Sequence, residues 1–253
     1  MKISILQFNQ TWASPQANIL RLDDLLGSRT DADVIVLPEM FSTGFCVEPE
    51  GIAEQPDGLS LQWMRHKAAE LQCAIAGSLS VVEDGTFRNR FYFIRPDGEP
   101  VYYDKHHLFS YGGENNYYAA GKERVIVTFR GVRFLLQVCY DLRFPVFSRN
   151  RNDYDVALYV ASWPHGRIAA WQALLRARAI ENQSFVVGVN RVGTDPVCRY
   201  SGGSGVFDAY GNRLAACRDD EEELITIELN MAELAEFRTK FPVLADLDDF
   251  EIK

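Results

Sequence analysis

The sequence has few of the residues and patterns that build metal centres, disulfide scaffolds or membrane spans. Its five cysteines are odd in number and include no Cys-x-x-Cys pair, and it has only four histidines, so neither a disulfide framework nor a zinc ligand set is predicted. No apolar run approaches the roughly 18 residues of a membrane span. The N-terminus lacks a secretory hydrophobic region and a small-residue cleavage site. We therefore expect a cytoplasmic protein with free thiols, without metal or other cofactor, and without membrane association.

Positive charge is also scarce. The 253 residues include 26 Lys and Arg against 35 Asp and Glu, which gives a net charge of −9, and no basic run interrupts this balance. Nucleic-acid binding depends mainly on Lys and Arg that neutralise phosphates. The composition therefore argues against a nucleic-acid partner.

The composition is otherwise that of a globular protein. Hydrophobic residues make up 47% and charged residues 24% of the chain, which excludes a disordered or fibrous protein. No linker rich in Pro, Gly or Ser and no low-complexity tract divides the sequence. Although 253 residues exceed the usual length of one domain, layered α/β proteins often reach this size as a unit, so we predict a single domain over residues 1–253.

The hydrophobic pattern alternates between strands and helices in both halves of the chain. Short apolar runs and turn residues predict strands, and a Ser-Pro start followed by an apolar stripe predicts a helix from residue 15. The predicted strands are 2–8, 33–37, 74–82, 86–95, 101–104, 125–129, 132–138, 156–161, 185–190, 202–214 and 224–229. The further helices are 60–72, 165–182 and 231–240, followed by an acidic, extended tail at 245–253. This order favours an α/β protein with two mixed sheets covered by helices, the second half resembling the first.

Three chemically capable residues stand at the ends of predicted strands. Glu39 follows DVIVLP, Lys105 follows VYYD, and Cys139 follows VRFLLQV. Ligands collect at strand ends in open α/β sheets. The three side chains are therefore candidates for one site.

Cys139 is the candidate nucleophile. A cysteine between a strand and a helix lies on a sharp turn, and the helix N-terminus is expected to lower the pKa of its thiol. The alternative is that Cys139 is a buried small hydrophobic residue.

The candidate base is a carboxylate, because the histidines are poorly placed. His66 has charged neighbours on a predicted surface helix, His106 and His107 should point to opposite faces of a strand, and His165 lacks an orienting carboxylate. Glu39 interrupts an apolar stretch and can act as a general base. Alternatively, Glu39 and Lys105 form a structural ion pair.

Taken together, these motifs resemble the nitrilase superfamily, the Glu-Lys-Cys carbon–nitrogen hydrolases. The resemblance rests on LPEMFSTGF, YYDKHHLF and VCYDLRFP, in this order, and continues through LYVASWP, WQALLRARAIENQ and NRVG. Within the superfamily, the sequence is most similar to bacterial ω-amidases, which hydrolyse 2-oxoglutaramate or 2-oxosuccinamate to the 2-oxo diacid and ammonia. The resemblance implies a four-layer αββα sandwich.

The resemblance also implies a role for each motif residue. Glu39 would take the proton from Cys139, which would attack the amide carbonyl and form a thioester. Lys105 and the backbone N–H of Tyr140 would stabilise the oxyanion. Glu114 stands where many members carry a second glutamate and would orient Lys105.

Substrate selection is expected from Arg143, four residues after the nucleophile and therefore about one helical turn away. A guanidinium can bind the distal carboxylate of a dicarboxylic ω-amide. The competing interpretation is an ion pair with Asp141, Asp153 or another acid. Aromatic residues expected to line the pocket are Phe41, Tyr111 and Trp163.

Several alternatives stay open from the sequence. Other activities of the superfamily are an amidase of deaminated glutathione, an N-carbamoyl amino-acid hydrolase and a nitrilase. A catalytically silent binding protein is a hypothesis of another class, although all three triad positions are filled. The resemblance further implies a homodimer.

Overall fold

Two six-stranded mixed sheets form the centre of the computed structural model, which describes residues 1–251. The first sheet has the strand order β14-β1-β2-β3-β4-β5. β1 to β3 are parallel, and the other three strands pair antiparallel. Its strands are β1 (Lys2–Gln7), β2 (Val34–Val36), β3 (Ala74–Glu83), β4 (Thr86–Ile94), β5 (Val101–Asp104) and β14 (Glu223–Glu228).

The second sheet has the order β13-β12-β9-β8-β7-β6 and again holds three parallel strands, β7 to β9. Its strands are β6 (Ile126–Phe129), β7 (Val132–Val138), β8 (Val156–Ala161), β9 (Phe185–Asn190), β12 (Gly205–Phe207) and β13 (Arg213–Ala216). The two halves of the chain therefore build similar sheets, as their sequence pattern predicts.

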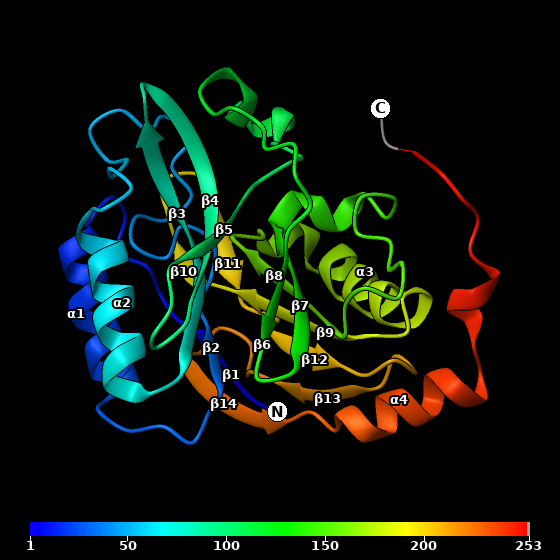
Figure 1. Cartoon of the computed structure of the whole chain (residues 1–253). Helices are drawn as coiled ribbons and strands as arrows, with labels where there is room; N and C mark the ends of the chain where they lie inside the picture. The colour runs from blue at the N-terminus through cyan, green and yellow to red at the C-terminus, as the bar shows by residue number, and fades with distance from the viewer. Residues whose placement is uncertain (252–253) are drawn as a thin grey trace.

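Helices cover the outer face of each sheet, which gives the expected αββα order of layers (Figure 1). α1 (Pro15–Leu26) and α2 (Leu59–Leu71) lie on the first sheet, and α3 (Ile168–Glu181) lies on the second. α4 (Met231–Lys240) follows β14. Among residues 1–251, no helix is long and apolar enough to cross a membrane.

Successive buried residues along one strand belong alternately to two different hydrophobic cores. On β2, Val34 and Val36 face the core between the sheets, whereas Ile35 faces α1 and α2. On β7, Leu136 belongs to the core between the sheets and Leu135 to the core under α3. Side chains two residues apart share one face of a strand, so continuous apolar runs mark strands that are buried on both faces.

Most predicted elements are present, and the differences lie in the second half. The predicted helix 165–182 begins as a 3-10 turn, His165–Arg167, before α3. The predicted strand 202–214 is interrupted by a turn between β12 and β13, and a small sheet of β10 (Val192–Thr194) and β11 (Arg199–Ser201) was not predicted.

The predicted extended tail is partly correct. Its start forms a 3-10 turn, Val243–Asp246, and residues 247–251 have no regular structure. The last two residues of the predicted tail lie outside the described residues.

Candidate active site

The ends of three strands bring Glu39, Lys105 and Cys139 to one cavity. Glu39 comes shortly after β2, Lys105 directly follows β5, and Cys139 directly follows β7. The first two residues come from one sheet and the cysteine from the other. The site therefore forms only where the two sheets face each other. The position of the three residues at strand ends predicted that they share a site, but not that the site joins two sheets.

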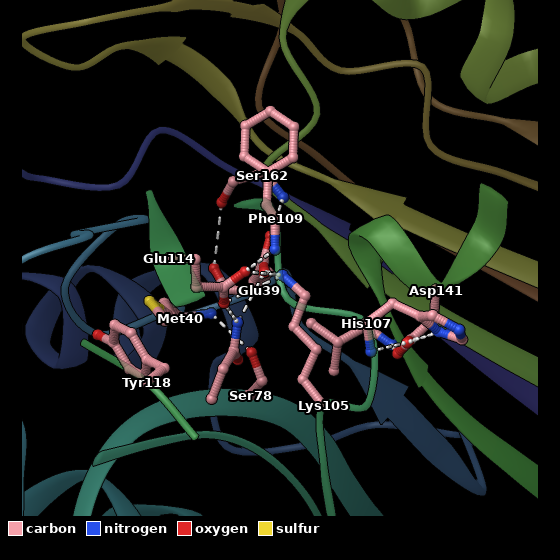
Figure 2. A network of polar contacts seen from close by, with 12 residues as sticks. Glu39, Met40, Ser78, Lys105, His107, Phe109, Glu114, Tyr118, Asp141 and Ser162 are labelled. Atoms are coloured by element: carbon pink, nitrogen blue, oxygen red, sulfur yellow. Dashed lines mark hydrogen bonds and ion pairs between the residues drawn. The ribbon is translucent and has the colours of Figure 1, made fainter. Parts of the chain in front are cut away.

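Lys105 lies between the carboxylates of Glu39 and Glu114. We call these three residues, together with Asn89, the acid–lysine cluster. Its Nζ is 2.9 Å from Oε1 of Glu39 and 2.9 Å from Oε2 of Glu114 (Figure 2). The side chains of all three charged residues are 0% exposed. A buried charge is tolerated when it is paired and hydrogen-bonded, and here each charge meets both conditions.

Asn89, on β4, joins the two glutamates and was not identified from the sequence. Its Nδ2 donates to Oε1 of Glu39 at 2.8 Å and to Oε1 of Glu114 at 3.1 Å. The backbone N–H of Lys105 donates to the Asn89 carbonyl at 2.9 Å. The sequence signal for Asn89 is weak: it is a polar residue at an inward position of a buried strand.

Backbone N–H groups fix the remaining carboxylate oxygens. The N–H of Ser162, just after β8, donates to Oε2 of Glu39 at 2.8 Å. The N–H of Phe109 donates to Oε2 of Glu114 at 2.6 Å. Both glutamates are consequently held in one orientation by rigid neighbours, which is the condition for efficient proton transfer and electrostatic catalysis.

Burial and mutual charge shift the pKa values in this cluster. Burial alone would lower the pKa of Lys105, but the negative charges of Glu114 and Glu39 raise it above its ordinary value. Burial raises the pKa of Glu114, and Lys105 offsets only part of that effect. Lys105 is therefore a permanent cation in the site.

Cys139 occupies a strained turn. Its φ is +46°, a left-handed conformation that is uncommon for residues other than glycine. The residue opens a 3-10 turn, Cys139–Arg143, rather than the α-helix that the spacing predicted. Backbone strain of this kind concentrates at functional sites because the surrounding structure must enforce it.

The expected lowering of the Cys139 pKa is wrong. Burial and the negative charge of Glu39 raise the pKa of this thiol well above its ordinary value, and Lys105 opposes them only in part. A five-residue 3-10 turn does not provide the aligned dipole of a longer helix. The cysteine is thus a thiol in the resting site, so its attack requires a base.

A buried aspartate connects the cysteine turn to the lysine loop. The carboxylate of Asp141 accepts hydrogen bonds from the Val138 N–H at 2.9 Å, the Tyr103 hydroxyl at 2.8 Å and the His107 N–H at 2.9 Å. Nδ1 of His107 is also 2.9 Å from this carboxylate (Figure 2). Asp141 is therefore engaged locally and does not pair with Arg143.

The adjacent histidines do not point to opposite faces. The rings of His106 and His107 are 4.5 Å apart, edge to face, and each stacks on a phenylalanine, Phe147 and Phe144 respectively. The prediction failed because β5 ends at Asp104, so strand alternation no longer applies. His66 and His165 are exposed and do not line the cavity of Cys139, in agreement with the prediction that the histidines are poorly placed to act as its base.

The cavity has a volume of about 160 Å³. Its apolar lining is largely aromatic, and Lys105, Glu39, Arg143, Arg167 and Asp195 supply charge. Besides these residues and Cys139, the lining consists of Phe45, Val47, Phe109, Gly112, Tyr140, Ser162, Trp163, Pro164, Val197, Cys198 and Tyr200. An apolar cavity with a few convergent polar groups is typical of small-molecule sites.

Trp163, Tyr140 and Arg143 line this cavity as predicted, whereas two predicted residues do not. Phe41 is fully buried against Trp63 in the core under α1 and α2. Tyr111 is 86% exposed. Phe41 lies only two residues beyond Glu39, but the turn at Met40, with φ +42°, directs it away.

Arg143 has no acidic partner among residues 1–251; its guanidinium lies 4.8 Å from the centre of the Trp163 ring. Asp153, the other predicted partner, pairs with Arg124 at 2.5 Å. The cation is therefore available to a ligand.

Within the described part of the chain, no group of three or more His, Cys, Asp or Glu could hold a metal ion.

The arrangement offers a base, a fixed cation and a thiol beside an aromatic cavity. Together they can activate a nucleophile and stabilise negative charge on a carbonyl oxygen.

The chain matches the carbon–nitrogen hydrolase family model over residues 2–239. It is 47% identical to the omega-amidase YafV of Escherichia coli strain K12 over 253 residues, 100% of this chain and 98% of that protein. It is 34% identical to the 2-oxoglutaramate amidase of Bacillus subtilis, with 97% and 96% of the two chains covered.

Solved structures agree with these sequence matches. A CN-hydrolase superfamily protein from Xanthomonas campestris, solved with an arsenic adduct in its active site, superposes with a TM-score of 0.97. It is 42% identical, and the match covers 100% of this chain and 99% of that one. Nit3 of Saccharomyces cerevisiae, at 22% identity and a TM-score of 0.85, shares the fold over 96% of this chain and 94% of its own. The chain belongs to the carbon–nitrogen hydrolase family.

Proposed function

We propose that the protein is an ω-amidase that hydrolyses the terminal amide of 2-oxoglutaramate or 2-oxosuccinamate. The observation that carries the proposal is the fixed contact of Lys105 with Glu39 and Glu114, because Lys105 and Glu39 line the cavity that holds Cys139. Arg143 faces the same cavity and has no acidic partner among the described residues, 1–251. A relative that is 47% identical is named an omega-amidase, and one that is 34% identical is named a 2-oxoglutaramate amidase.

The first half of the reaction forms a thioester. Glu39 takes the proton of the Cys139 thiol as the sulfur attacks the amide carbon, because a thiol with a raised pKa does not ionise by itself at neutral pH. The carbonyl oxygen becomes an oxyanion beside Lys105 Nζ and the N–H of Tyr140. The C–N bond then breaks, and Glu39 returns the proton to the departing ammonia.

The second half releases the acid. A water molecule loses a proton to Glu39 and attacks the thioester carbon, and the C–S bond breaks to regenerate the thiol. The products are the 2-oxo diacid and ammonia, and one water is consumed. Lys105 stays protonated through both steps because Glu39 and Glu114 raise its pKa.

Arg143 is assigned to the carboxylate at the far end of the substrate. Its guanidinium can donate two parallel hydrogen bonds to a carboxylate, and Trp163 supports its flat face. An ω-amide of a dicarboxylic acid carries this carboxylate, whereas a simple aliphatic amide does not.

The direct test is ammonia release from 2-oxoglutaramate by the purified wild type and by Cys139→Ala. We expect turnover in the first and none above background in the second. Absence of turnover by the wild type, with activity on another amide, would move the assignment elsewhere in the family. The substrates to compare are deaminated glutathione, N-carbamoyl amino acids and aliphatic nitriles.

A silent binding protein is the alternative of another class. Mass spectrometry after incubation with 2-oxoglutaramate and an acid quench distinguishes it from an enzyme. An acyl group on Cys139, and on none of Cys46, Cys73, Cys198 and Cys217, is expected for a catalytic thiol, because Glu39 deprotonates Cys139 as it attacks the carbonyl carbon. No acyl group on Cys139, together with no turnover, would favour the silent protein.

The proposal includes a single domain, a homodimer and a cytoplasmic location. The dimer rests on the family resemblance, and the location on the composition. Light scattering of the purified protein measures the oligomeric state, and fractionation of cells that express the native gene measures the location. A monomer at micromolar concentration would contradict the dimer.

A further inference from the structure

A second arginine, Arg167, lines the cavity in addition to Arg143. Its guanidinium lies 5.4 Å from the centre of the Phe109 ring, and Phe109 lines the same cavity. The two guanidinium groups thus rest on two aromatic residues, Phe109 and Trp163. We call these four residues the arginine wall.

The backbone of Arg167 is fixed by its neighbours. Nε1 of Trp163 donates to the Arg167 carbonyl at 2.8 Å, and the Arg167 N–H donates to the Pro164 carbonyl at 3.0 Å. The tryptophan that supports the Arg143 guanidinium therefore also holds the main chain of Arg167. The positions of the two cations are coupled through one rigid ring.

Arg167 takes part in none of the ion pairs of the described residues, 1–251. Besides Glu39, the cavity lining contains one further acid, Asp195, and its oxygens are already engaged. Oδ1 accepts from the N–H groups of Val197 and Cys198, at 2.8 and 2.7 Å, and Oδ2 accepts from the Tyr200 hydroxyl at 2.6 Å. Asp195 therefore shapes the loop, and the guanidinium of Arg167 is left to a ligand.

Neither arginine is a solvated surface cation of the ordinary kind. Both are half-buried, both lie against aromatic rings, and both border the cavity that holds Cys139. Guanidinium groups stack on aromatic rings and bind planar anions in a fork geometry. Two such groups in a small cavity favour a planar anionic head with several acceptor oxygens.

We infer that Arg167 is a specificity residue that, with Arg143, binds the 2-oxo acid head of the substrate and selects it over a 2-amino acid head. This inference rests on the proposed ω-amidase function and deepens it. A 2-oxo acid presents only acceptors, the carboxylate and the ketone oxygen, to groups that can only donate. Glutamine and asparagine replace the ketone with an ammonium group, which would meet two cations.

The test measures kcat/KM of the wild type and of Arg167→Gln on 2-oxoglutaramate, L-glutamine and glutaramate, the corresponding amide without a substituent at position 2. We expect Arg167→Gln to lose about tenfold or more on 2-oxoglutaramate, mainly through KM, because a buried polar contact to the ketone is removed. The loss on glutaramate should be smaller, and the ratio of 2-oxoglutaramate to L-glutamine should fall.

Two further variants separate charge from geometry. Arg167→Lys keeps the positive charge but not the fork, so it should still reject L-glutamine while binding 2-oxoglutaramate less well than the wild type. Arg213→Gln removes an exposed arginine of β13 outside the cavity. It should leave kcat/KM unchanged on 2-oxoglutaramate, L-glutamine and glutaramate. Protection of Cys139 from iodoacetamide by 2-oxoglutarate gives a readout of binding alone and should weaken in Arg167→Gln.

The outcomes distinguish the two proposals. A wild type that hydrolyses 2-oxoglutaramate, with the same substrate ratio and the same protection in Arg167→Gln and Arg167→Lys, would overturn the role of Arg167 and leave the ω-amidase intact. A wild type without activity on 2-oxoglutaramate would overturn both.

Discussion

The cavity combines two charged regions that are built in opposite ways. In the acid–lysine cluster, the charged side chains are fully buried, and each one has partners within the protein. In the arginine wall, both cations are half-buried, rest on aromatic rings and lack acidic partners in the described chain. A fully paired cluster is prepared for chemistry before substrate arrives, whereas an unpaired wall is completed by the substrate.

This difference has a physical reason. Removing a partner from a buried charge pair is costly because the remaining charge has no solvent, so the acid–lysine cluster must be complete in the free enzyme. A half-exposed guanidinium keeps part of its hydration and tolerates an empty cavity. Substitutions in the acid–lysine cluster should therefore be more costly than substitutions at the edge of the arginine wall.

Lys105→Ala should have the largest effect because it leaves Glu39 and Glu114 facing each other without a cation. We expect turnover to fall by about a thousandfold or more, since an oxyanion donor is lost, and stability to fall by about 3–5 kcal/mol. Ammonia release and denaturant unfolding measure the two effects.

Lys67→Ala is the matched control. Lys67 on α2 is also largely buried and pairs with two acids, Asp23 at 2.8 Å and Glu70 at 2.7 Å, but these are partly exposed and lie outside the cavity. This variant should be less destabilised and should retain turnover. Equal loss of activity in both variants would mean that Lys105 acts only through stability.

Asp141→Asn should have the next largest effect. The amide cannot accept at its nitrogen, so a donor among Val138, Tyr103 and His107 loses its partner at a cost of about 1–3 kcal/mol. Because these bonds set the cysteine turn against the lysine loop, small displacements should lower kcat by up to about a hundredfold. KM should change little. A normal kcat with reduced stability would make the role of Asp141 purely structural.

The pH dependence of Cys139 labelling tests the electrostatics directly. Burial and Glu39 raise the pKa of the thiol, whereas Lys105 lowers it. Glu39→Gln should therefore move the pH midpoint of iodoacetamide labelling downward, and Lys105→Ala should move it upward. Thiolate forms only as the pH rises through the folded-state pKa, so wild-type labelling should still increase above pH 9. Shifts of the same sign in both variants would contradict the assignment.

Tyr111→Ala should have the smallest effect. The residue is 86% exposed, and its ring contacts Phe109 from outside, with 5.8 Å between ring centres. Surface substitutions usually change stability by less than about 0.5 kcal/mol, and we expect kcat/KM to stay within about twofold. A large loss on 2-oxoglutaramate would mean that the arginine wall extends over Tyr111 when substrate binds.

The predictable part of the site consists of residues whose position follows from strand ends. Glu39, Lys105 and Cys139 stand next to strands that apolar runs reveal, and motif resemblance then groups them. The prediction for Phe41 failed because it depended on the direction of the chain after a positive-φ residue, Met40. Asn89 and Arg167 were missed because a lone polar residue on a strand or at a helix start is a weak signal, which does not by itself indicate a site.

The order of strands and helices, the three reactive residue types and the family follow from the chain alone, because they depend on local periodicity and on motifs. Which charges are paired depends instead on how the chain folds in space. Lys105 meets two glutamates from distant segments, Asp141 bonds Tyr103 and His107, and Arg143 is left without an acidic partner in the part of the chain that the structure describes. Ion pairs depend on distances of a few ångströms and on exclusion of solvent, and neither is encoded in the local pattern of the chain.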